Sequence, residues 1–142
     1  MNAKWIERFI NLAAHVATWS KDPSSQVGAV IIRPDRSVAS VGFNGLPRAV
    51  SDDPARFADR DQKLLYTVHA ELNAILAARE PLHGYSIVVY PFQPCAACAA
   101  AIIQAGISEV ICPEVPDASR WADSFHAART MFREAGTVVR WF

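Results

Sequence analysis

Two short segments of the sequence carry residue types that bind metal ions and move protons. The first is His69-Ala70-Glu71, and the second is Pro94-Cys95-Ala96-Ala97-Cys98. Together they supply one imidazole and two thiols, which is a set of three zinc ligands with a fourth coordination position left open. An open position is typical of catalytic rather than structural zinc. We therefore predict that His69, Cys95 and Cys98 hold a zinc ion.

Each of these segments is expected to begin a helix. Cys95 and Cys98 are three positions apart, so their sulfurs share one face of the first turn and can reach one ion. The partial positive charge of a helix N-terminus favours their thiolate form. Glu71 and His69 are two positions apart and would point to different sides of a regular helix. Only if the helix end is aimed at the ion can the Glu71 carboxylate take a proton from a water at the open position.

The combination of the two segments is more specific than either alone. A lone CxxC pair is also typical of redox sites and of half a zinc finger, but a finger would need a fourth ligand at finger spacing. His83 and Cys112 lie in or beside the wrong elements for that role. HxE followed by PCxxC, with Cys95 26 positions after His69, is the signature of zinc-dependent nucleobase deaminases. A structural zinc site and an inactive scaffold are the alternatives.

Hydrophobic periodicity and turn residues divide the rest of the chain into helices and strands. The order predicts an α/β fold with a central sheet covered by helices on both faces, and residues 1–142 as one domain. The stretch from Asn44 to about Lys63 has no clear period, so we expect a long irregular loop that is functional or mobile. The expected helices are 1–18, 67–79, 95–104 and 120–134, and the expected strands are 27–32, 37–43, 86–90, 109–112 and 137–141.

The composition excludes several classes of protein. The 14 Lys and Arg residues balance the 14 Asp and Glu residues, so the net charge is zero and no basic surface for a polynucleotide is expected. Apolar residues make up 51% of the chain, which argues against disorder. Three cysteines, an odd number, fit a reducing compartment. The N-terminus starts with an amphipathic pattern and no long apolar run follows, so we expect a soluble, cytoplasmic protein without leader or membrane contact.

From about residue 15 to residue 112 the sequence resembles the cytidine deaminase superfamily, and within it the deoxycytidylate deaminases. The zinc motifs carry the likeness to the superfamily, and the segments around Lys21 and Asn44 carry the likeness to the nucleotide branch. The sequence departs from the family at Ala96-Ala97, at Gln93 and at Phe43, where that branch usually has tyrosine. The matching segments are 20–24, 26–29, 42–47, 51–53 and 69–75.

The resemblance implies a three-layer α/β/α cytidine deaminase-like fold with a central mixed five-stranded sheet. It also implies that His69, Cys95 and Cys98 hold zinc and that Glu71 shuttles protons while water attacks C4 of a cytosine ring. The amino group then leaves as ammonia, and the base becomes uracil. The expected substrate is a free cytosine nucleotide, dCMP, and the expected product is dUMP. Members of the family are homo-oligomers, often hexamers, and some are regulated by dCTP and dTTP.

Further residues are expected to contact the substrate. Related enzymes place an asparagine against the sugar, which points to Asn44, and the backbone N–H of Ala70 can donate to the base carbonyl because a helix start leaves such groups without partners. A 5′-phosphate would need cationic or hydroxyl partners. The candidates are Lys21, Ser24, Ser25 and Arg48. Each has another interpretation: an Asn-Gly turn with positive φ for Asn44, solvated charges for the cations, and ordinary turn residues for the serines.

Two other functions remain open at this point. The same chemistry could act on cytosine, guanine, a pterin or adenine in tRNA, although the absence of a basic run disfavours a nucleic-acid substrate. The chain could also be a non-catalytic module stabilised by zinc. Glu71 argues against such a module, because a structural site has no need of a carboxylate two residues from a ligand.

Overall fold

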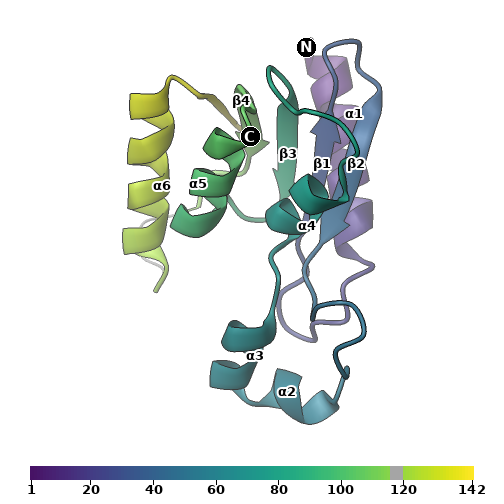
Figure 1. The fold of residues 1–142 in the computed structure, drawn as a ribbon. Helices are drawn as coiled ribbons and strands as arrows, with labels where there is room; N and C mark the ends of the chain where they lie inside the picture. Colours follow the sequence, from purple (N-terminus) through teal and green to yellow (C-terminus); the bar gives the residue numbers. More distant parts are fainter. Residues whose placement is uncertain (116–119) are drawn as a thin grey trace.

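A mixed five-stranded sheet forms the centre of the molecule (Figure 1), in the computed structural model that describes residues 1–115 and 120–142. The strand order is β2-β1-β3-β4-β5. Strand β1 pairs antiparallel with β2 and β3, whereas β3, β4 and β5 run parallel. The strands are β1 (Gly28–Ile32), β2 (Val38–Phe43), β3 (Ser86–Tyr90), β4 (Glu109–Cys112) and β5 (Val138–Trp141). The expected mixed α/β sheet is thereby confirmed.

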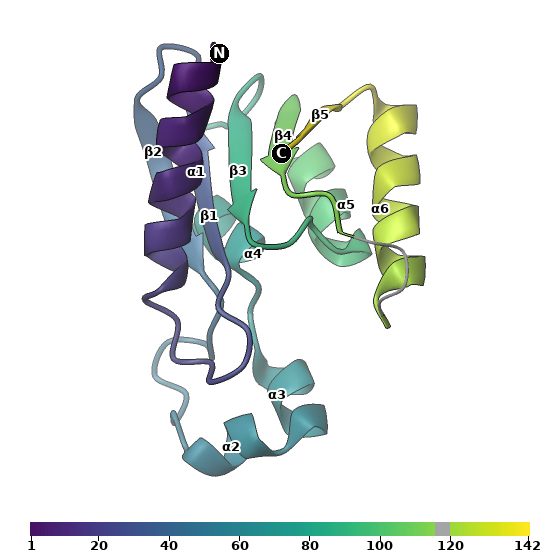
Figure 2. The ribbon, with the colours of Figure 1, turned by 180° about the vertical axis from the view of Figure 1, so that it is seen from behind.

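Helices cover both faces of this sheet, as Figures 1 and 2 show from opposite sides. One face packs against α1, where Val30, Val88 and Ile111 meet apolar side chains of that helix. The other face packs against α4, α5 and α6. Because both faces are covered, the central strands are continuous apolar runs rather than alternating ones. The helices are α1 (Ala3–Ala17), α2 (Pro54–Ala58), α3 (Arg60–Tyr66), α4 (Ala70–Ala77), α5 (Ala96–Gln104) and α6 (Ala122–Ala135).

The stretch from Asn44 to Lys63 differs from the expected irregular loop, because it contains α2 and the first part of α3 beyond one end of the sheet (Figure 1). Side-chain caps start both helices. The Asp53 carboxylate accepts from the N–H of Ala55, and that of Asp59 accepts from the N–H groups of Asp61 and Gln62. Neither helix has a fully buried residue, so the sequence shows no strong hydrophobic period there.

Helix α4 begins three residues later than the sequence pattern predicts. Val68 exchanges two backbone hydrogen bonds with Gly45, which keeps residues 67–69 extended. His69 therefore occupies the N-cap position of α4 instead of lying within its first turn. Within the part of the chain that the structure describes, none of the helices combines the length and apolarity needed to cross a membrane.

The start of α4 lies directly against the sheet because small residues meet there. Ala70 and Ala74 are completely buried. A Cβ atom on Gly42 of β2 would lie 2.3 Å from the backbone nitrogen of Ala74 and 2.4 Å from the carbonyl oxygen of Ala70. Only glycine permits this approach, so Gly42 fixes the distance between β2 and the helix that carries Glu71.

We predict that Gly42→Ala lowers the free energy of unfolding by about 3 kcal/mol, since the new methyl group must push α4 off the sheet. The matched control is Gly45→Ala, because a Cβ atom at Gly45 meets no atom within 4 Å. Urea unfolding of both variants measures the difference. Equal stability of the two variants would contradict the close approach of α4 to β2.

Candidate metal and active site

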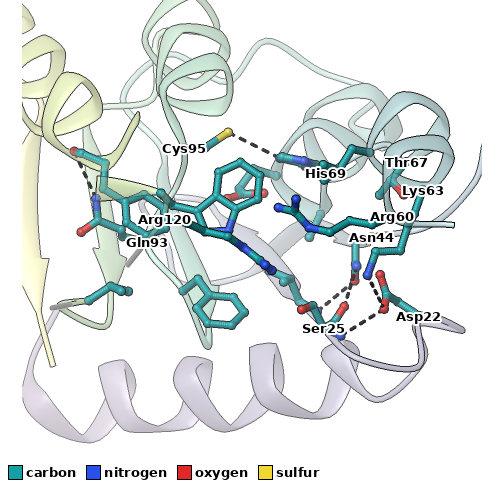
Figure 3. A pocket seen from close by; sticks show the side chains of 18 residues that line it. Asp22, Ser25, Asn44, Arg60, Lys63, Thr67, His69, Gln93, Cys95 and Arg120 are labelled. Atoms are coloured by element: carbon teal, nitrogen blue, oxygen red, sulfur yellow. Dashed lines mark hydrogen bonds and ion pairs between the residues drawn. The ribbon is translucent and has the colours of Figure 1, made fainter. Parts of the chain in front are cut away.

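Two helix starts bring three potential metal ligands together. His69 is the N-cap residue of α4, Cys95 is the N-cap residue of α5, and Cys98 lies in the first turn of α5. The Nδ1 atom of His69 is 3.5 Å from the Sγ atom of Cys95 and 3.4 Å from that of Cys98. All three donor atoms lie within 4.8 Å of one another. Figure 3 shows the side chains of His69 and Cys95 pointing toward each other.

This donor set fits zinc. One imidazole nitrogen and two sulfurs at this spacing can share a tetrahedral ion and leave its fourth position to water or substrate. The pKa of the Cys95 thiol is lowered to about 4, first by the hydrogen bond that Cys98 donates to it and then by His69. A thiolate is the form of cysteine that binds metal. The third cysteine, Cys112, is buried in the core beneath α4–α6, and among residues 1–115 and 120–142 it joins no cluster of potential metal ligands.

Glu71 reaches the same site as His69 despite the two-residue spacing. His69 has extended backbone angles, so the helical geometry that would separate the two side chains begins only at Ala70. The Glu71 side chain lines the same cavity as His69 and Cys95 and is only 4% exposed. Burial raises the pKa of its carboxyl to about 7. A buried carboxyl next to an open metal position is the arrangement that proton transfer to and from a bound water requires.

His69, Cys95 and Glu71 form part of the wall of a cavity of 340 Å³, a volume within the range of small-molecule sites. In Figure 3, His69 and Cys95 lie on one side of this cavity and Asp22 and Ser25 lie away from them. Loops and helix starts from the whole length of the chain supply the wall. The lining residues are Asp22, Ser25, Val27, Asn44, Arg60, Lys63, Leu64, Thr67, His69, Ala70, Glu71, Phe92, Gln93, Cys95, Val115, Arg120, Trp121 and Phe125.

One face of α3 supplies a cationic part of the wall that is not among the residues expected from the sequence. Arg60, Lys63, Leu64 and Thr67 all line the cavity, at positions i, i+3, i+4 and i+7. The spacing is present in the sequence, but it places these residues on one face only if the segment before residue 67 is a helix, which the hydrophobic pattern does not indicate. Within the described residues, the buried Oγ1 of Thr67 has no hydrogen-bond partner, which leaves it available to a ligand.

Lys63 also joins α3 to the loop after α1. Its Nζ donates to the Ser24 hydroxyl at 2.8 Å and lies 3.4 Å from the Asp22 carboxylate. Asp22 is itself buried and accepts from the N–H groups of Ser24 and Ser25. Burial alone would raise the pKa of Asp22, but these hydrogen bonds and Lys63 together lower it. The loop and α3 are therefore held together by a carboxylate that stays ionised at neutral pH.

Asn44 lines the cavity and fastens the loop in front of β1. Its Oδ1 accepts from the N–H of Val27 at 2.9 Å, and its Nδ2 donates to the carbonyl of Ser25 at 2.8 Å. The alternative of an Asn-Gly turn with positive φ does not hold, because the non-glycine residues with positive φ in the described chain are Arg36 and Ala49.

The structure separates the remaining candidates. Ala70, at the start of α4, lines the cavity. Lys21 forms an ion pair with Asp52 at the surface, and Arg48 is exposed; neither belongs to the cavity wall. Ser24 also lies outside the wall, although it accepts from Lys63, whereas its neighbour Ser25 lies within it.

Several aromatic and polar residues of the wall carry no signal in the sequence alone. Phe92 and Gln93 come from the connection between β3 and α5, and Arg120, Trp121 and Phe125 come from the start of α6. Their spacing from the zinc motifs follows no fixed pattern, so only the fold brings them to the cavity. Gln93 stands out in the sequence only as a departure from the resembled family.

The comparisons with known proteins agree with this geometry. The family described as "Cytidine and deoxycytidylate deaminase zinc-binding region" matches residues 3–114. A deaminase from the luxG 3′ region of Aliivibrio fischeri, described as uncharacterized, is 50% identical over 99% of this chain and 95% of its own length. Human deoxycytidylate deaminase is 42% identical over 98% of this chain and 80% of its own length.

Solved structures show the same fold. The dCMP deaminase of cyanophage S-TIM5 in apo form superposes with a TM-score of 0.77 at 21% identity and covers 100% of both chains. The same enzyme in complex with dCMP and dUMP gives a TM-score of 0.76. The family match covers most of the chain and includes every residue of the His69, Cys95 and Cys98 cluster. The chain therefore belongs to the cytidine and deoxycytidylate deaminase family, which is defined by its zinc-binding region.

Proposed function

We propose that the protein is a zinc-dependent hydrolytic deaminase of a free cytosine nucleotide, and that it converts dCMP to dUMP with release of ammonia. The observation that carries the proposal is the buried Glu71 carboxyl, which lines a cavity of 340 Å³ next to a cluster of three metal donors. The human relative at 42% identity is a deoxycytidylate deaminase, and the S-TIM5 enzyme binds dCMP and dUMP. Both support this choice among the amino-heterocycles.

His69 Nδ1 and the sulfurs of Cys95 and Cys98 would hold the zinc ion. When bound, zinc supplies Lewis-acid chemistry that lowers the pKa of a water at its open position to about 7. The two helix N-termini that carry these donors add partial positive charge, which stabilises the two thiolates. The hydrogen bond to Cys95 raises the pKa of the Cys98 thiol in the metal-free protein, so zinc binding would displace the proton of Cys98.

Glu71 would move the protons of the reaction. Its carboxylate takes a proton from the attacking water and gives it to N3 of the cytosine ring while the water oxygen bonds to C4. It then takes the remaining proton from the new hydroxyl on C4 and gives it to the amino group, so that the C4 carbonyl forms as the C4–N bond breaks and ammonia leaves. Because Glu71 is withdrawn from solvent, its protons pass to the substrate rather than exchange with bulk water.

Ala70 and Asn44 would orient the nucleotide. The N–H of Ala70 is at the start of α4, where the helix offers it no partner, and it can donate to the base carbonyl. Asn44 uses one N–H and one lone pair on the loop in front of β1. A carboxamide has a second N–H and a second lone pair, which can meet a hydroxyl of the sugar.

The phosphate would lie against α3. Arg60 and Lys63 of α3 both line the cavity, and in Figure 3 Lys63 lies beside Asp22, on the side away from Cys95, while Arg60 extends toward the centre of the cavity. Two cations on one short helix suit a single phosphate group. The chain as a whole has zero net charge, so it offers such local contacts without the broad basic surface that a polynucleotide requires.

We also propose that residues 1–142 form one deaminase domain and that this domain assembles into a homo-oligomer. Several large apolar side chains are exposed on the single chain around α3 and α4. Leu65 is 82% exposed and Leu76 is 67% exposed. Apolar side chains exposed to this degree in neighbouring helices are typical of surfaces that contact another protein.

We predict that Cys98→Ala abolishes stoichiometric zinc binding, because two remaining ligands cannot hold the ion firmly. The matched control is Cys112→Ala, which removes a buried thiol outside the cluster and keeps one zinc per chain. Metal analysis of the purified variants measures the difference. Full zinc content in Cys98→Ala would exclude the proposed ligand set.

We predict that Glu71→Gln keeps zinc but lowers kcat for dCMP by about 1,000-fold, since the amide cannot carry the proton. An ammonia-release assay over dCMP, CMP, deoxycytidine, cytosine, guanine and pterins measures both the activity and the preference. Preference of the wild type for a free base would retain the chemistry and contradict the nucleotide substrate. No release from any substrate would favour a non-catalytic zinc module.

We predict that Arg60→Ala raises KM for dCMP about tenfold and leaves KM for deoxycytidine within about twofold. Only the nucleotide carries a phosphate that Arg60 can contact. The comparison variants are Arg48→Ala and Lys21→Ala, whose cations lie outside the cavity wall. Steady-state kinetics with both substrates separates the two sets. A selective effect of Arg48→Ala or Lys21→Ala, with none of Arg60→Ala, would place the phosphate at the residues expected from the sequence.

A further inference from the structure

A buried amide stands next to the metal donors and has no part in the chemistry proposed above. Gln93 lies two residues before Cys95, lines the cavity and is 3% exposed. A buried carboxamide is stable only if its donor and acceptor groups find partners. Its neighbours along the chain, Phe92 and Pro94, have no side-chain polar group to offer. The partners come instead from α6, a helix almost thirty residues further along the chain.

Arg129 of α6 satisfies the acceptor of Gln93. Its Nε and Nη2 atoms donate to Gln93 Oε1 at 3.2 and 2.8 Å. The Nε2 atom of Gln93 donates in turn to the carbonyl of Phe125 at 3.3 Å. A guanidinium has no acceptor, so these bonds allow only one orientation of the Gln93 amide, with the oxygen toward Arg129.

The same guanidinium also holds the next connection of the sheet. Arg129 Nη2 donates to the carbonyl of Val115 at 3.0 Å, and Val115 lines the cavity. The guanidinium carbon lies 5.4 Å from the centre of the Trp141 ring, which fixes its plane from the side of β5. One charged group therefore connects the segment after β3 with the segment after β4, and each of them contributes to the cavity wall.

The metal donors have a separate support. The N–H of Ala96, which follows Cys95, donates to the Ser124 hydroxyl at 2.9 Å. The turn of α5 that carries Cys98 is also held by its own helical hydrogen bonds, beginning with the bond from Ala99 N–H to the Cys95 carbonyl. Loss of the Arg129 contacts would therefore loosen the wall around the substrate and leave the ligand set in place.

We propose that Arg129 is a positioning residue of this site. It holds Gln93 and Val115 so that the cavity wall beside Cys95 is formed before the nucleotide enters. This inference rests on the proposed deamination of dCMP. A preformed wall lowers the free energy that binding must spend on ordering loops, so its loss acts on affinity. Arg129 acts through its neighbours and is assigned no contact with the reacting atoms.

The test compares Arg129→Lys with Arg133→Lys, a matched change at an exposed position one turn further along α6. Lysine keeps the charge but cannot reproduce the hydrogen bonds that the guanidinium fork makes to Gln93 and Val115. We expect Arg129→Lys to raise KM for dCMP and the Kd of dUMP about tenfold each, with kcat within about threefold of wild type. Zinc content remains at one per chain, and Arg133→Lys behaves as wild type.

Gln93→Leu and the double variant Arg129→Lys/Gln93→Leu test the path of the effect. If Arg129 acts through Gln93, the double variant raises the Kd of dUMP by less than the product of the single effects. Unchanged KM and Kd in Arg129→Lys overturn the inference, and so does a loss of zinc or of kcat with KM unaltered. A wild type that neither releases ammonia from dCMP nor binds dUMP overturns the proposed function, and with it the role of Arg129.

Discussion

The site depends on one constraint, which is that α4 and α5 begin at the same place on the same face of the sheet. Both helices pack on that face through small side chains, Ala70 and Ala74 in α4 and Ala99 in α5. Because Gly42 has no side chain, the backbone of α4 can contact β2 directly. Because each helix places a metal donor at its N-cap, the packing of two helix ends creates the ligand set. The partial positive charge at a helix N-terminus also favours thiolates at that position.

The rest of the cavity is attached to this junction by hydrogen bonds of charged groups. Lys63 and Asp22 join α3 to the loop after α1, on the side proposed for the phosphate. Arg129 joins the segment after β3, through Gln93, to the segment after β4, through Val115. The metal donors thus sit at the starts of two regular helices, whereas much of the substrate wall comes from loops and the short helix α3, which polar contacts hold in place. Such a division suits a fold whose chemistry is fixed and whose substrate varies.

How far the sequence predicts this structure depends on how local each feature is. The ligand set was accessible because Cys95 and Cys98 share one helical turn, and the strands because their apolar runs are unbroken. Helices α2 and α3 were missed because aspartate caps, rather than buried apolar faces, define them. The substrate wall was predicted least well, since contacts between distant segments bring Arg60 to the cavity and place Arg129 behind Gln93 and Val115. In the sequence Lys21 is a suitable candidate for a phosphate contact. In the structure it pairs with Asp52 at the surface and does not line the cavity.

The central claim is that zinc has three protein ligands here and one open position. X-ray absorption at the zinc edge of the purified protein measures this directly. The geometry predicts two sulfurs at about 2.3 Å and one nitrogen at about 2.0 Å, with a fourth, light scatterer from solvent. It also predicts that Cys112→Ala leaves this spectrum unchanged. A shell of four protein ligands, or one with a single sulfur, would contradict the account.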